Sequence, residues 1–533
     1  MANKRFKIYL PLLFAVVMAI GMQLGFNLYE TLKGKPSKKM YASNQVSPVE
    51  EIINYIDAKY VDEVDKEKLM EEMIRATLND LDPHSYYISS DELQAVNENL
   101  QGNFEGIGIE FAIVKDTILV VTPIVGGPSE SLGIQAGDKI INIEDSLVAG
   151  VNIKNEDVGK KLRGEKGSTV DIDILRSGTA ELMNFEIKRD KIPLHSLDVG
   201  YMLDEKVGYI KINRFSATTY EEFYAKLKEL NEQGMEDLIL DLRQNPGGYL
   251  KAAVDMADEF ISGRNLLVYT EGKSQRRKDY RAQQVGLFEN GDLVVMVDEG
   301  SASASEIVAG AVQDWDRGTI VGRRSFGKGL VQEQDLLSNG SALRLTIARY
   351  HTPSGRCIQK SYEEGTEAYR NELNERLEDG GILEEDSIDA VEGEELFKTL
   401  VKGRSVFGGG GIRPDVFVPL DTTGTEHFLV RAKSLIPNFV YEYYANNKTV
   451  FENYPVLEIY QNKFKVDDAL MTTFRQHLKD EIDFVDDRLL EREKEIFKIL
   501  IKAHLARQLW QSEGFYSIIY ELDDALQVAH KQF

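Results

Sequence analysis

The 533-residue sequence contains a single cysteine, Cys357, and only seven histidines. One cysteine cannot form an intramolecular disulfide, and it excludes the zinc patterns that need several cysteines. No two histidines have the HExxH or HxH spacing of a metal site, so we expect neither a metal nor a cofactor. Basic residues (63) are outnumbered by acidic ones (88), and the net charge of −25 argues against a nucleic-acid partner, because phosphate binding needs a basic surface.

The N-terminus is the one place with a long apolar run. Three basic residues within 4–7 precede apolar residues 8–26, which approach the roughly 20 residues that span a bilayer. A cleavable signal peptide would be cut near 19–21, whereas a signal anchor would keep the whole of 1–30. The anchor is favoured because apolar residues continue past the cut. The sequence therefore predicts a single-pass inner-membrane protein with its catalytic domain in the periplasm and a polar linker over 31–47.

Two patterns follow the linker. Residues 48–100 have apolar side chains at helical spacing and are predicted to be helical, with a turn at LDPHSYY (81–87). Residues 101–191 change to short β-rich runs around one helix expected at Glu156–Leu162, which indicates a small β-domain.

A glycine-rich segment in this β-domain precedes an apolar strand and resembles the carboxylate-binding loop of PDZ domains. Such a loop exposes backbone N–H groups to a peptide's terminal carboxylate, and the strand edge pairs with the peptide. The alternative is an ordinary small barrel with glycine turns. The segment predicts these peptide-binding residues: Gly106, Ile107, Gly108 and Ile109.

Residues 192–422 alternate apolar strands with helices, which indicates an α/β sheet covered on both faces. The expected helices are Tyr220–Gln233, Leu250–Ile261 and Ala304–Asp314. An acidic segment, 361–410, interrupts this block and is predicted to be a surface insertion, mobile in part. Residues 423–533 are amphipathic and helix-rich, which predicts a helical C-terminal domain.

Chemistry is concentrated around three serines, Ser301, Ser303 and Ser305, between an apolar strand and a helix. A helix N-terminus supplies backbone N–H groups and a positive dipole that stabilise an oxyanion. Serines before a helix are also common N-caps, although three in five residues cannot all be caps. A nucleophilic serine needs a base, and no histidine lies near these serines in sequence.

Lys328 is the alternative base. Burial lowers the pKa of a lysine and allows it to accept a proton near neutral pH. The surrounding GRRSFGKG also approaches a phosphate-binding loop, but Gly329 stands where that loop needs Ser or Thr for Mg²⁺.

Longer motifs decide between these interpretations. The motifs are SASASEIVAGAVQD, VGRRSFGKGLVQ, DLRQNPGG, YHTPSGRCIQ, GIRPDV and LDPHSYY. Residues 48–420 contain these motifs in the order seen in the C-terminal processing, or tail-specific, peptidases and resemble that family. The resemblance implies a Clp protease/crotonase-like α/β core with an inserted PDZ domain, no metal, and a serine endopeptidase activity.

The resemblance also implies site residues. Ser303 matches the nucleophile, Lys328 the general base of a Ser-Lys dyad, and Gln332 the residue that orients the lysine. The implied oxyanion donors are the backbone N–H of Ala304 and of Gly247 or Gly248. Supporting polar positions are Asp241, Arg243 and Glu306, for which a buried ion-pair network holding strand ends is an equal interpretation.

The expected substrates are extracytoplasmic proteins with apolar C-termini, which the PDZ domain would capture. A homodimer or higher oligomer through the helical ends is left open. The alternative function is a catalytically idle, membrane-tethered PDZ adaptor, but the intact Ser303, Lys328 and Gln332 argue against it. A chymotrypsin-like protease is disfavoured because GDSGG is absent. A crotonase-type acyl-CoA enzyme would carry neither a PDZ domain nor an export signal.

Overall fold

The computed structural model describes residues 48–179, 181–378, 380, 382–383 and 395–533, together with Met18, Gly21 and Gln23. The predicted segment 1–30 and linker 31–47 otherwise lie outside these residues. Across the described part of the chain, no helix combines the length and apolarity needed to cross a bilayer. The prediction of a single-pass inner-membrane protein is corrected accordingly.

The chain divides into two compact units, Met1–Ile74 and Arg75–Phe533. The described part of the first unit contains α2 (Pro48–Lys59) and the start of α3 (Lys66–Asn79). Both helices have glutamates in their first turn, where they complement the helix dipole.

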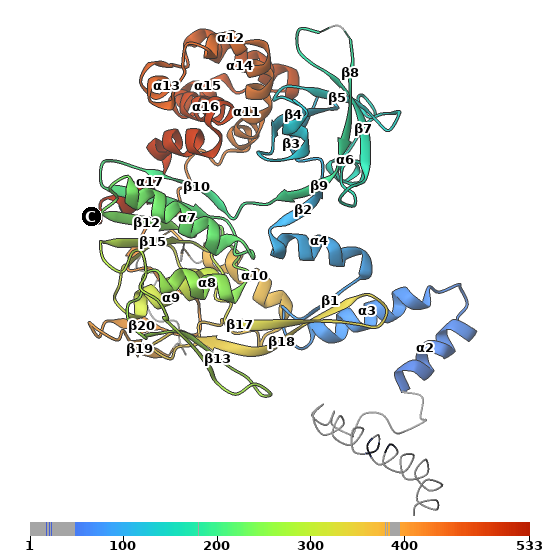
Figure 1. Ribbon diagram of the computed structural model, residues 1–533, viewed down its shortest axis with the longest axis vertical. Coiled ribbons are helices and arrows are strands. Elements are labelled where there is room, and N and C mark those ends of the chain that lie inside the picture. Colours follow the sequence, from blue (N-terminus) through green and yellow to red (C-terminus); the bar gives the residue numbers. More distant parts are fainter. Residues whose placement is uncertain are drawn as a thin grey trace, which may run out of the picture. The chain divides into compact units, whose positions relative to one another are not determined.

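One six-stranded sheet of the second unit is mostly parallel (Figure 1). Only its first pair, β10 with β11, is antiparallel. The strands in spatial order are β10 (Leu197–Met202), β11 (Val207–Ile212), β12 (Asp237–Asp241), β15 (Leu293–Val297), β16 (Thr319–Gly322) and β21 (Val416–Phe417).

Helices cover both faces of this sheet. Because successive strand residues point to opposite faces, neighbouring residues of one strand pack in different apolar cores. Leu240 and Val295 pack with helices α7 (Thr219–Glu232), α8 (Leu250–Asp258) and α9 (Ala304–Asp314). Their strand neighbours Ile239 and Met296 pack instead with residues from the C-terminal end of the chain. That end comprises part of α16 (Lys494–Ile519), η2 (Tyr520–Leu522) and α17 (Asp524–His530).

A second, antiparallel sheet contains the long pair β17 and β18. Its strands are β1 (Tyr86–Ile88), β13 (Leu266–Glu271), β14 (Lys278–Arg281), β17 (Leu330–Leu336) and β18 (Ala342–His351). The LDPHSYY segment is therefore more than the predicted turn between helices. Its tyrosines enter β1, whose backbone pairs with β18 from Ala342 to Arg344.

The β-domain over 101–191 contains a sheet of antiparallel strands, entered from helix α4 (Ser90–Gln101). The pair β2 (Asn103–Gly106) and β9 (Asp190–Pro193) joins its two ends. The other elements are β3 (Ile109–Val114), β4 (Thr117–Pro123), α5 (Pro128–Ser131), β5 (Lys139–Ile143), β6 (Ser146–Leu147), α6 (Asn155–Leu162), β7 (Thr169–Leu175) and β8 (Met183–Lys188).

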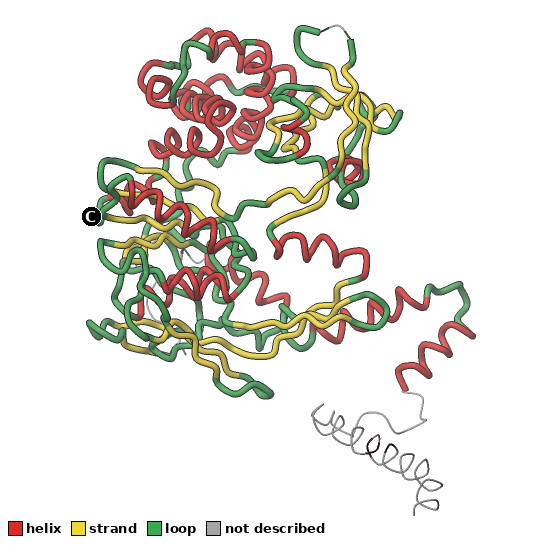
Figure 2. The backbone as a smooth tube through the Cα atoms, in the orientation of Figure 1, coloured by secondary structure: helices red, strands yellow, loops and turns green. Residues whose placement is uncertain are grey.

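The C-terminal part is helical, which confirms the prediction of an α/β chain with a helical C-terminal region (Figure 2). Before it, the acidic insertion contains α10 (Thr366–Glu378), β19 (Leu396–Lys398) and β20 (Ser405–Phe407). The helices that follow are α11 (His427–Asn446), α12 (Lys448–Phe451), α13 (Leu457–Lys463), α14 (Asp468–Glu481), α15 (Asp487–Arg492) and α16. They enclose an apolar core of their own.

Candidate active site

The three serines before α9 differ in what their hydroxyl groups do. Ser301 and Ser305 are buried, and their hydroxyls donate to the carbonyls of Leu242 (2.8 Å) and Asn245 (2.9 Å). Ser303 is partly exposed and faces Glu306 N in a capping-box arrangement, but within the described residues its hydroxyl donates to no carbonyl. Its backbone has φ of 55°, which is strained for a non-glycine residue and is typical of functional turns. Among the described residues, the middle serine is thus the one whose hydroxyl proton is not donated to a backbone carbonyl.

Lys328 lies in the loop before β17, and its amine donates to Gln332 Oε1 at 3.1 Å. Its side chain is partly buried. Burial first, and then the positive charge of Arg344, lower the pKa of Lys328, while Asp82 and Glu306 oppose the shift. Within the described residues no hydrogen bond joins the lysine amine to the Ser303 hydroxyl.

Glu306 connects the serine turn to the lysine loop. It sits in the first turn of α9 and is fully buried. Burial raises the pKa of Glu306 to about 7, although its hydrogen bonds favour the charged form. It accepts from four donors: Ser303 N (2.7 Å), Ser325 Oγ (2.5 Å), Gly327 N (2.7 Å) and Lys328 N (2.9 Å). Glu306 therefore holds the two candidate catalytic backbones together without touching the cavity.

Tyr350, on β18, makes a second connection, which sequence reasoning missed. Its buried hydroxyl lies 2.6 Å from the carbonyl of Lys328 and 3.0 Å from the carbonyl of Ser303, so one hydrogen is shared between them. The signal was available, because Tyr350 begins the recognised YHTPSGRCIQ motif.

His84 is another residue whose role at the site was missed. Gln332, besides accepting from Lys328, donates through Nε2 to the backbone carbonyl of His84. The His84 ring lies 2.8 Å from the hydroxyl of Tyr369, on α10. Burial, with Lys328 the next cause, lowers the pKa of His84 to about 4, so its ring is neutral at neutral pH. Part of LDPHSYY thus fixes the amide that holds the lysine.

The two predicted oxyanion glycines have different environments. The N–H of Gly247 already donates to Asn245 Oδ1 at 2.9 Å. A Cβ at Gly247 would lie 2.8 Å from the nitrogen of Ala304, so this glycine lets the loop approach the serine turn. No acceptor among the described residues pairs with the N–H of Ala304 or Gly248. Of the predicted donors, these two are free.

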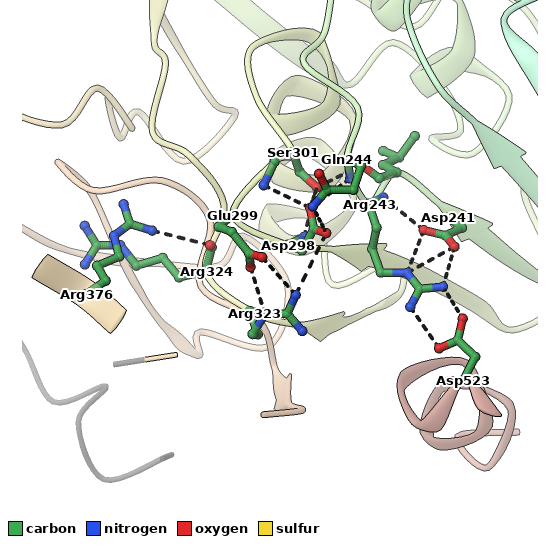
Figure 3. Close-up of polar contacts among 12 residues, drawn as sticks. Asp241, Arg243, Gln244, Asp298, Glu299, Ser301, Arg323, Arg324, Arg376 and Asp523 are labelled. Carbon is green, nitrogen blue, oxygen red and sulfur yellow. Dashed lines mark hydrogen bonds and ion pairs between the residues drawn. The ribbon is translucent and has the colours of Figure 1, made fainter. Parts of the chain in front are cut away.

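Asp241 and Arg243 form an ion pair in the network drawn in Figure 3. Asp241 is fully buried and accepts from Arg243 (Nη2, 2.7 Å) and from the Tyr209 hydroxyl (2.8 Å). The far side of Arg243 donates to Asp523, at the start of α17. The geometry of these two residues is therefore that of a buried ion-pair network at the end of a strand.

A cavity of about 510 Å³ brings the remaining residues together. It is lined by Ser303, Lys328, Gln332, Gly247 and Gly248, by apolar side chains including Leu250, Ile307, Leu330 and Val331, and by polar ones including Asn97, Gln334 and Arg344. Among the described residues, no group of three or more His, Cys, Asp or Glu side chains is arranged to hold a metal ion. A partly exposed serine at a helix N-terminus with a partly buried lysine on the same cavity wall has the chemistry of a serine hydrolase.

The predicted peptide-binding loop lies between β2 and β3. Ile107 is buried in the core of the β-domain, and its carbonyl accepts from the Ser129 hydroxyl at 2.6 Å. Gly108 has a φ of 75°, where a Cβ would lie 3.0 Å from Ile192. Ile109 begins β3, which pairs only with β4 among the described strands and so has a free edge. The loop can contribute its backbone to a ligand, but Ile107 contributes its side chain to the core.

Comparison with known proteins identifies the family. A model of peptidase family S41 matches residues 206–367, and one of a family of unknown function, DUF8443, matches 427–511. The carboxy-terminal processing protease CtpB of Bacillus subtilis (strain 168) is 34% identical over 367 residues, 66% of this chain and 74% of the relative.

Two solved structures are also similar. The photosystem II D1 C-terminal processing protease is 30% identical, covering 58% of this chain and 89% of the other, with a TM-score of 0.34. The PDZ domain of a carboxy-terminal protease from Vibrio cholerae is 31% identical, covering 17% of this chain and 99% of the other, with a TM-score of 0.16.

The chain belongs to peptidase family S41, with the carboxy-terminal processing proteases. It is thus a member of a family of serine peptidases, and the predicted family is confirmed.

Proposed function

We propose that the chain is an endopeptidase in which Ser303 is the nucleophile and Lys328 the general base. The observation that carries this proposal is that Ser303, the one of the three serines whose hydroxyl donates to no backbone carbonyl among the described residues, shares a cavity with a lysine of lowered pKa. The fixed backbone of both residues, held by Glu306, supports it further.

The reaction follows from these groups. The Ser303 hydroxyl attacks the scissile carbonyl carbon and transfers its proton to the amine of Lys328. The N–H groups of Ala304 and Gly248 stabilise the oxyanion. The C–N bond then breaks as Lys328 returns the proton to the leaving amine. Water hydrolyses the acyl-enzyme by the same steps, which releases the carboxylate product and regenerates Ser303.

Gln332 keeps the lysine amine oriented between turnovers. Because unliganded sites are often looser than reacting ones, we expect bound substrate to bring Lys328 within hydrogen-bonding distance of Ser303.

The β-domain is proposed to bind the apolar carboxyl terminus of the substrate as a PDZ domain does. The free edge of β3 can pair with an extended peptide, and the loop at Gly106–Ile109 can bind the terminal carboxylate through its backbone. Replacing the last three apolar residues of a substrate by aspartate should therefore raise KM and leave kcat nearly unchanged.

Proteolysis of an unfolded protein with an apolar tail tests the dyad. Ser303→Ala and Lys328→Ala should each lower kcat/KM by more than about 1,000-fold. The exposed Ser274 and Lys273, on another loop, provide matched controls, and Ser274→Ala and Lys273→Ala should cleave like the wild type. Equal cleavage by all variants would refute the dyad, whereas no cleavage by the wild type would favour a non-catalytic adaptor.

A further inference from the structure

The C-terminal end of the chain packs on the protease core, although it is far in sequence from the catalytic loops. Ala525, Leu526 and Ala529 of α17 are buried against strand residues that include Val294 and Met296. These strand residues belong to β15, which leads into the serine turn. The last helix is therefore part of the core, on the face opposite α9.

Asp523, just before α17, makes two kinds of contact. One carboxylate oxygen caps the helix by accepting from Leu526 N at 2.9 Å. The same carboxylate accepts two hydrogen bonds from Arg243, from Nη1 at 2.9 Å and Nη2 at 2.7 Å (Figure 3). Paired, charge-assisted bonds of this kind fix the guanidinium plane as well as its distance.

Arg243 is fixed on its other side by a buried carboxylate. Its backbone N and Nε donate to Asp241 Oδ1 at 2.9 and 3.0 Å, and its carbonyl accepts from Lys211 at 3.2 Å. Burial disfavours the Asp241 carboxylate, but Arg243 and Lys211 outweigh it and hold the pKa of Asp241 well below its usual value. Asp241 is therefore charged, and together with Asp523 it holds the guanidinium from both sides.

The loop that begins at Arg243 ends at the free N–H of Gly248. Between them, Gln244 is bonded to Asp298 through its backbone (2.8 Å) and its side chain (2.7 Å). The carbonyl of Asn245 accepts from Ala302 N at 2.9 Å, beside the nucleophile. A shift of Arg243 would therefore be transmitted to both sides of the oxyanion site.

We propose that Asp523 is a positioning residue for this oxyanion loop, and that it acts through Arg243. The inference rests on the proposed function, because it presumes that Ser303 forms an acyl-enzyme beside Gly248. Asp523 touches neither substrate nor cavity. Its contribution is to keep the donor loop in the geometry that the transition state needs, and such placement strongly affects rate.

The test is Asp523→Asn in the full chain. Asparagine is the same size and also caps helices, so α17 should persist, but it loses the charge and one acceptor for Arg243. We expect kcat to fall about 10-fold with KM within about twofold, because only the transition state uses the oxyanion donors. Asp524→Asn, one residue on and exposed, is the matched control and should keep wild-type kcat.

Two further readouts separate positioning from lost folding. A peptidyl boronate forms a tetrahedral adduct on the nucleophile, so its Ki should rise by the same factor as kcat falls. Titration with a fluorophosphonate should still find a full complement of reactive serine. Arg243→Gln should lower kcat similarly, and the double variant should be no worse than either single one, because both act through one contact.

Several outcomes would overturn the inference. An Asp523→Asn variant with wild-type kcat, beside an inactive Ser303→Ala, would refute positioning and leave the proposed function standing. A loss of rate equal to the loss of titratable serine would show a purely structural role. A wild-type chain that neither cleaves nor reacts with the probe would refute the proposed function, and the inference with it.

Discussion

The surroundings of Lys328 disfavour the positive charge of its amine and lower its pKa. Burial is the larger cause, and the guanidinium of Arg344 on the same cavity wall is the next. Since only the neutral amine can accept a proton from Ser303, kcat/KM should rise with pH through the pKa of Lys328, and the midpoint should lie below 10.5.

Arg344→Gln tests the electrostatic part of that shift. Removing the positive charge should raise the pKa of Lys328, move the pH profile of kcat/KM to higher pH, and lower activity at pH 7 by a few-fold. Arg349→Gln, an exposed change on the same strand, should leave the midpoint in place. An unchanged midpoint in Arg344→Gln would mean that its charge does not act on Lys328.

Helix α10 shows how an element predicted to lie on the surface supports the site. It belongs to the acidic insertion, yet Tyr369 is buried and Arg376 donates to the carbonyl of Ser325 at 3.0 Å. Glu372 pairs with Lys360 at 2.9 Å. The acidic composition of the segment did not predict these contacts, because only a few side chains on one face of the helix make them. In the described part of the insertion, helix α10 therefore contacts and supports the loop that contains Lys328.

Tyr369→Phe measures this support. The variant loses the hydroxyl that meets the His84 ring, so the His84 carbonyl that holds Gln332 becomes less constrained. We expect a loss of about 1 kcal/mol in stability and a several-fold fall in kcat. Tyr224→Phe, an exposed tyrosine on α7, is the control, and both are compared by thermal unfolding and steady-state kinetics. Wild-type kcat in Tyr369→Phe would separate α10 from catalysis.

At the scale of the whole molecule, helix α17 packs on the face of the core sheet opposite α9 and covers part of it. Leu526 is almost fully buried there. Leu526→Ala should lower the free energy of unfolding of the core by about 3 kcal/mol, through lost burial and a residual cavity.

Urea unfolding followed by the fluorescence of Trp315, which lies at the end of α9, measures this change in a Trp510→Phe background. Lys531→Ala, at an exposed position, should change the free energy by less than about 0.5 kcal/mol. A similarly small effect of Leu526→Ala would mean that the C-terminal end does not contribute to the stability of the core.

Local pattern predicted some elements closely. Ala304–Asp314 has the bounds of α9, and the helix expected at Glu156–Leu162 is α6. The antiparallel sheet was missed, because β17 and β18 mix polar and apolar residues and are held by pairing with each other.

The sequence alone determined the family, the α/β alternation and the candidate residues Ser303 and Lys328, because catalytic motifs and strand–helix periodicity are local properties. Only the tertiary structure decided which of three serines donates its hydroxyl to no carbonyl among the described residues, which glycine has a free N–H there, and which residues Tyr369 and Asp523 contact. Those facts depend on hydrogen bonds between segments up to 285 residues apart. No local pattern encodes such contacts, since they exist only once packing brings the segments together.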